Sequence, residues 1–100
     1  MQVQMIENWS QIAGKLCSWT PESDVPGFGV AEIAVDGVEP VSAFPNLLDD
    51  AAGQVVRVLV PRDSANALKD ASGSRVTVRV RRAGPHRVYA HPDHVTVETK

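Results

Sequence analysis

The sequence predicts an all-β domain spanning residues 1–100, in which five strands and one short helix follow each other along the chain. Residues 54–60 and 75–82 are rich in valine that alternates with polar residues, which is the period of a half-buried strand. Proline and glycine lie between the apolar segments, as expected where turns join strands. The 100 residues are enough for one hydrophobic core.

The first half of the chain supplies two predicted strands. Residues 9–19 form the first strand, and Gly14 near its middle is typical of a bulge or a sharp bend. Residues 20–29 contain two prolines and two glycines and predict a turn-rich connection. Residues 30–35 alternate in polarity and form the second strand.

The segment that follows, residues 39–53, predicts a structured loop because Pro40 and Pro45 interrupt any strand. The third strand, residues 54–60, then ends at Pro61.

A short helix is predicted between the third and fourth strands. Asp63 or Ser64 supplies an N-cap, the helix runs to Asp70, and Gly73 ends it. The apolar residues of this helix expected to face inward are Ala65, Leu68 and Ala71.

The last third of the chain supplies the fourth and fifth strands. Residues 75–82 form the fourth, whose valines share one face while its arginines share the other. A turn at Gly84-Pro85 leads to the fifth strand, residues 87–90 and 95–98, interrupted at Pro92. The valines predicted to form core are Val56, Val58, Val76, Val78 and Val80.

This order of elements, β-β-β-α-β-β, resembles the OB-fold. Residues 12–16 resemble the first strand of single-stranded-DNA-binding proteins, and residues 67–78 resemble their helix, turn and fourth strand. The resemblance extends over nearly the whole chain as a pattern of elements. It implies a five-stranded Greek-key barrel that binds single-stranded nucleic acid. An SH3-like barrel is the alternative fold.

Charge is divided unequally along the chain although the net charge is only −2. Residues 1–53 contain eight acidic residues and one base, whereas residues 54–100 contain nine bases and four acidic residues. Such a division can mark a basic binding face. The other interpretation is that the two halves interleave in one barrel and pair with each other.

OB-folds that hold single strands combine bases along the phosphates with aromatic rings on which nucleobases stack. Arginines two apart on a strand share a face and lie roughly 6.8 Å from one another. The residues expected to bind nucleic acid, DNA or RNA, are Lys15, Trp19, Arg57, Arg75, Arg79, Arg81 and Tyr89.

The alternative function is a non-catalytic subunit that docks on a larger assembly. Phe44, Leu47 and Leu48 place three large apolar residues in a segment expected to be exposed, which can mark a protein partner site.

Several other classes of function have no support in the sequence. It has no GxSxG, P-loop or GxGxxG motif, so neither catalysis nor a cofactor is expected. His86, His91, His94 and Cys17 lack the paired spacing of a zinc site, and the histidines are expected to be exposed in turns. No apolar run is long enough to cross a bilayer, no secretory signal is recognisable, and the lone cysteine fits the cytoplasm.

Overall fold

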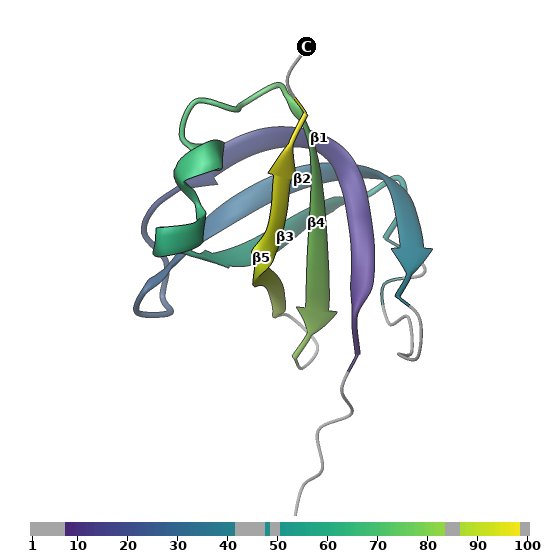
Figure 1. The fold of residues 1–100 in the computed structure, drawn as a ribbon, viewed down its shortest axis with the longest axis horizontal. Coiled ribbons are helices and arrows are strands. Elements are labelled where there is room, and N and C mark those ends of the chain that lie inside the picture. Colours follow the sequence, from purple (N-terminus) through teal and green to yellow (C-terminus); the bar gives the residue numbers. More distant parts are fainter. Residues whose placement is uncertain (1–7, 42–47, 49–50, 84–86, 99–100) are drawn as a thin grey trace, which may run out of the picture.

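In the computed structural model, which describes residues 8–41, 48, 51–83 and 87–98, five strands close into a barrel (Figure 1). The strands are β1 (Ser10–Thr20), β2 (Phe28–Pro40), β3 (Val55–Pro61), β4 (Arg75–Arg82) and β5 (Val88–Val97). Their order around the barrel is β1-β2-β3-β5-β4, and β4 pairs with β1 to close it. Only the β3–β5 pair is parallel. The predicted fold class, a five-stranded Greek-key barrel of the OB type, is therefore confirmed.

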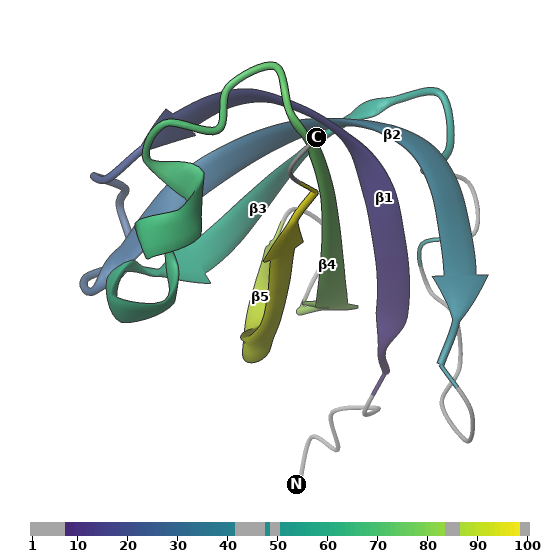
Figure 2. The ribbon, with the colours of Figure 1, turned by 45° about the horizontal axis from the view of Figure 1, so that its top comes forward.

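Two irregularities bend β1, which curves with β2 over the barrel (Figure 2). At the first, between Ala13 and Gly14, the register with β2 shifts at the glycine that the sequence predicts, and Asp36 of β2 is the extra residue. A Cβ atom on Gly14 would lie 2.1 Å from the carbonyl oxygen of Ala34, so only glycine allows the backbones to approach this closely. At the second, between Leu16 and Ser18, Cys17 is the extra residue.

The core fills the barrel with small aliphatic side chains. Val58, Val76, Val78 and Val80 are buried as predicted, whereas Val56 is only partly buried against the same cluster. The other core residues are Ile12, Leu16, Ala31, Ile33, Val35, Leu48, Ala51, Val60, Ala65, Leu68, Ala71, Val88 and Ala90.

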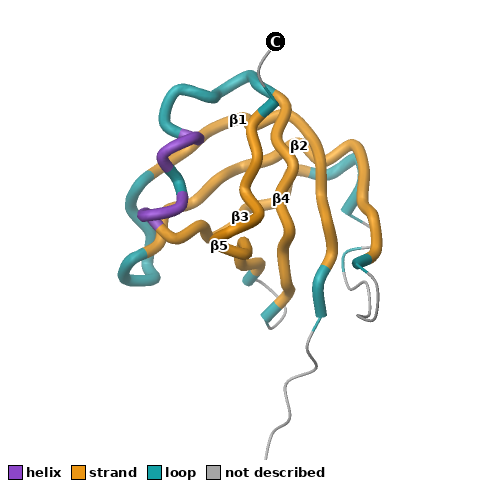
Figure 3. The backbone as a smooth tube through the Cα atoms, in the orientation of Figure 1, coloured by secondary structure: helices purple, strands orange, loops and turns teal. Residues whose placement is uncertain are grey.

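The predicted helix after β3 is wrong in type. Two short 3-10 turns, η1 (Arg62–Ser64) and η2 (Asn66–Leu68), replace an α-helix and lie at one end of the barrel (Figure 3). Backbone N–H groups donate to the carbonyl three residues earlier, from Leu68 to Ala65 and from Ala71 to Leu68. The buried residues therefore recur every three positions, which matches three residues per 3-10 turn. A segment this short gains little from α-helical hydrogen bonds alone.

The strand boundaries differ from the sequence prediction mainly in β2 and β5. Strand β2 extends to Pro40, at the edge of the region predicted as a loop. Strand β5 continues through Pro92, but its pairing with β4 jumps from Ala90 to Val95. Residues 91–94 therefore bulge from the ladder at the predicted interruption. The predicted turn at Gly84-Pro85 lies outside the described residues.

We expect Val78→Asp to unfold the domain, since its side chain is 1% exposed in the middle of the core. An unpaired carboxylate there should cost about 4 kcal/mol or more of the free energy of unfolding. Val55→Asp, at a side chain that is 57% exposed, provides the matched control and should leave stability within about 0.5 kcal/mol. Thermal denaturation followed by circular dichroism measures both variants. Equal melting temperatures for the two would contradict the assigned facing of β4.

Candidate functional site

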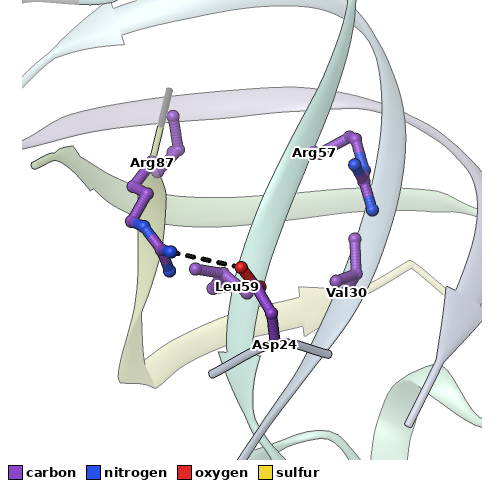
Figure 4. A pocket seen from close by; sticks show the side chains of 6 residues that line it. Asp24, Val30, Arg57, Leu59 and Arg87 are labelled. Carbon is purple, nitrogen blue, oxygen red and sulfur yellow. Dashed lines mark hydrogen bonds and ion pairs between the residues drawn. The ribbon is translucent and has the colours of Figure 1, made fainter. Parts of the chain in front are cut away.

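A hollow of about 210 Å³ lies on the outside of the barrel, where the β1–β2 connection meets the start of β5 (Figure 4). It is smaller than the roughly 300–1,000 Å³ of a pocket for a drug-sized ligand, so it accommodates a single ring or a phosphate group. The residues that line it are Asp24, Val30, Arg57, Leu59, Arg87 and Val88.

The floor of the hollow is apolar and belongs to the outer face of the sheet. Val30 and Leu59 are paired across β2 and β3. Their chain neighbours Ala31 and Val58 are core residues, so Val30 and Leu59 point outward. Each is nevertheless only 8% exposed, because the longer side chains around the hollow cover it.

The connection between β1 and β2 is braced by its own hydrogen bonds. The Ser23 hydroxyl hydrogen-bonds the carbonyls of Val25 and Phe28, and the Val25 N–H donates to Ser23 Oγ at 3.1 Å. From η1, directly after β3, Arg62 Nε donates to the carbonyl of Pro21 at 2.6 Å. These bonds hold the loop in one shape and thereby place Asp24 at the hollow.

Two arginines stand on opposite sides of the hollow (Figure 4). Arg87 Nη2 lies 3.2 Å from Asp24 Oδ2, an ion pair that joins the β1–β2 connection to the segment before β5. A hydrogen bond with the Tyr89 side chain, together with the nearby Asp24 carboxylate, raises the pKa of Arg87. Arg57 is exposed on β3, opposite Glu32 of β2, and forms no ion pair with any described residue.

Two aromatic rings extend the site along β5. Tyr89 is paired with Leu59 across the parallel β3–β5 contact, and its ring meets that of Phe28 edge-on at 5.5 Å. The guanidinium carbon of Arg81 lies 5.6 Å from the centre of the Tyr89 ring. The predicted residues Arg57, Arg81 and Tyr89 thus gather in and beside the hollow.

Lys15 and Arg75 lie elsewhere, paired across β1 and β4 beside a second hollow. Arg75 holds Asp36 through both guanidinium NH₂ groups, with Nη2 donating to Asp36 Oδ1 at 2.8 Å, and approaches Glu98 at 4.0 Å. The Arg75 hydrogen bond lowers the pKa of Asp36, and Asp36 in turn raises the pKa of Arg75. Two carboxylates therefore already neutralise the charge expected to bind phosphate.

Trp19 does not share a face with Lys15. The extra residue Cys17 shifts the register, so that Trp19 pairs with Ala31 of the core. Its ring packs where a Cβ atom of Gly29 would lie, 2.4 Å from Trp19 Cη2. A surface stacking role for Trp19 is therefore at odds with its inward position.

Leu48, one of the three apolar residues expected to contact a protein partner, is not accessible on the surface. This residue is 1% exposed and packs in the core. Phe44 and Leu47 lie outside the described residues, so the structure bears on only one of the three.

The described residues contain no group of three or more His, Cys, Asp and Glu side chains that could hold a metal ion. None of the helical turns in that part of the chain has the length and hydropathy to cross a membrane. A scan of protein-family models found no match to the sequence, and a comparison with curated proteins found no similar one.

Sequence reasoning predicted Arg57 but missed the other residues that line the hollow. Asp24, Val30, Leu59 and Arg87 come from separate strands and loops, and only the barrel brings them together. The position of Leu59 could have been recognised from the sequence, because residues 58–60 are all apolar in a strand whose other residues alternate in polarity. An apolar residue on the outward phase of a strand indicates a covered outer face.

The pairing of Arg75 with Asp36 predicts a pH effect. The pKa of Asp36 lies below its ordinary value of 3.8, so its ion pair stabilises the fold above that pH and is lost as pH falls through the lowered pKa. We expect the Asp36 carboxyl to titrate below 3.8 by NMR and to return toward 3.8 in Arg75→Ala. An unchanged Asp36 titration in the variant would contradict the pairing.

Proposed function

We propose that this barrel binds single-stranded nucleic acid at the hollow between β2, β3 and the start of β5. The observation that carries the proposal is the apolar floor of Val30 and Leu59 flanked by Arg57 and Arg87. In OB-folds the face of strands 2 and 3, with the loops that flank it, is where oligonucleotides and oligosaccharides bind.

The chemistry of the flanking groups favours a phosphate-bearing ligand. Arg57 and Arg87 can each hydrogen-bond a phosphate with two parallel N–H groups. The floor of Val30 and Leu59, each 8% exposed, offers a nucleobase a small apolar contact, and the ring of Tyr89 offers a base a stacking partner next to Arg81. Two arginines line the hollow and Arg81 lies beside it, and their positive charge attracts a phosphate-bearing ligand more strongly than an uncharged sugar.

The acidic half of the chain does not oppose this function as strongly as its composition predicts. Asp36 is bound to Arg75 and Asp24 to Arg87, so two of its carboxylates are neutralised by arginines of the basic half. Of these two carboxylates, only that of Asp24 lies at the hollow. It forms an ion pair with Arg87, whose guanidinium would otherwise be free to bind a phosphate. The interleaving of the two halves, weighed from the sequence, thus coexists with a basic site.

Replacement of Arg57 should weaken binding of oligothymidylate for electrostatic reasons. Loss of one phosphate contact should flatten the slope of log affinity against log salt by about 0.7, the value for a single-stranded ligand. Fluorescence anisotropy of a labelled oligonucleotide at several salt concentrations measures both quantities for Arg57→Ala.

Arg75→Ala is the matched control, because it removes the same charge from a site already bound to Asp36. Its affinity and salt slope should stay close to those of the parent protein. Equal losses in the two variants would indicate a nonspecific effect of net charge and would argue against the hollow. Absence of binding at low salt by the folded parent protein would remove the nucleic-acid function.

Asp24→Asn should raise the affinity for the same oligonucleotide. The substitution frees Arg87 and removes a carboxylate that repels phosphate, so we expect a gain of about twofold to fivefold, the size of one exposed ion pair. Asp70→Asn, with the same change of net charge at an exposed position after η2, should leave the affinity nearly unchanged. A loss of affinity in Asp24→Asn would mean that Asp24 contacts the ligand directly.

A further inference from the structure

A second group of aromatic rings lies on the outside of the barrel, over β4. The rings of Trp9 and His91 are 5.1 Å apart between centres, and those of His91 and His94 are 4.6 Å apart. Trp9 comes directly before β1 and His91 belongs to β5, and β4 runs between these two strands. We call the rings of Trp9, His91 and His94 the outer platform.

Alternation along the strands sets the direction of the platform. Ser10 and Ala90, the neighbours of Trp9 and His91, are buried, so Trp9 and His91 point outward. On β4 the same face carries Arg79 and Arg81, since Val78 and Val80 point into the core. The platform therefore shares its face with two arginines.

Hydrogen bonds at both edges hold the platform in place. Asn8, which is 3% exposed, donates from Nδ2 to the Arg82 carbonyl at 3.0 Å and accepts from the Arg82 N–H at 2.8 Å. These two hydrogen bonds fix Asn8, the residue before Trp9, to the end of β4. On β5, the Asp93 N–H donates to His91 Nδ1 at 3.1 Å, which fixes the ring within the bulge of residues 91–94. A ring fixed in advance loses little conformational entropy when a ligand stacks on it.

One arginine on this face has hydrogen-bonding capacity that the described residues do not use. Arg79 Nε is buried and donates to no described residue. Arg79 and Arg81 each appear in none of the ion pairs of the described part of the chain. Two positive charges thus lie beside three rings without a carboxylate bound to either.

The platform continues the candidate site. Tyr89 precedes His91 by two residues on the same face of β5, which separates them by roughly 6.8 Å. The rings of Phe28, Tyr89, His91 and Trp9 therefore follow one another from the hollow across β5 and over β4, with Arg81 and Arg79 beside the path. Figure 1 shows β5, β4 and β1 side by side in this order.

We infer that a bound single strand leaves the hollow across β5 and over β4, and that two of its bases stack on His91 and Trp9. Arg81 and Arg79 neutralise the phosphates of this part of the strand. The inference rests on the proposed function and assigns a place in the binding surface to His91, which the sequence predicts to be exposed in a turn but which lies partly buried in β5. It makes the binding site longer than the hollow alone, within the range of about 4–16 nucleotides that one OB-fold covers.

The two tryptophans provide a test, because Trp9 belongs to the platform and Trp19 packs against the core. In Trp19→Phe, Trp9 is the only tryptophan. An oligothymidylate of about 12 nucleotides should quench its emission, whereas one of about 4 nucleotides should bind the hollow and leave the emission nearly unchanged. In the control variant Trp9→Phe, the remaining Trp19 should respond to neither oligonucleotide.

His91→Ala tests the same surface without any change at Trp19. Anisotropy of the labelled oligonucleotides should show an affinity about tenfold lower for the longer one and unchanged for the shorter one. Unchanged Trp9 emission with the longer oligonucleotide, or full affinity of His91→Ala for it, overturns the inference while leaving the hollow as the site. If the parent protein binds neither oligonucleotide at low salt, the proposed function itself fails.

Discussion

The closed barrel depends on the close approach of β1 and β2 at Gly14. A side chain at this position would collide with the backbone of Ala34, so the bend in β1 requires glycine. Strand β1 pairs with β2 on one edge and with β4 on the other, and these pairings close the five strands into a ring. Closure of the barrel gives each strand an inner face and an outer face. The valines of the core lie on the inner faces, and the strand residues of the proposed binding surface lie on the outer faces.

Charge in this protein is organised by tertiary pairing and not by sequence position. Asp36 of β2 binds Arg75 of β4, and Asp24 of the β1–β2 connection binds Arg87 before β5. Each pair joins the acidic half of the chain to the basic half. Arg57, Arg79 and Arg81 are left without an ion pair among the described residues, on the outward faces of β3 and β4. The basic surface that results is smaller than the composition of residues 54–100 predicts, and it is interleaved with aromatic rings.

The proposed binding surface combines segments that are distant in the chain. The hollow joins a loop of the first half to β3 and β5, and the outer platform joins the residue before β1 to β5 across β4. In both places hydrogen bonds fix the residue that carries the chemistry: local ones at Ser23 for the hollow, and long-range ones between Asn8 and Arg82 for the platform. Rigid support of this kind lets side chains on loops bind without a large loss of conformational entropy.

The sequence by itself determined the all-β class, the five strands, the bend at Gly14 and most of the core, because strand alternation and glycine geometry are local properties. It also predicted that Ala65, Leu68 and Ala71 face inward, although their spacing of three belongs to 3-10 turns. The tertiary structure alone decided which charges pair and which side Trp19 faces. Both depend on register: one extra residue at Cys17 turns Trp19 inward, and no local pattern reveals which strand will lie beside which.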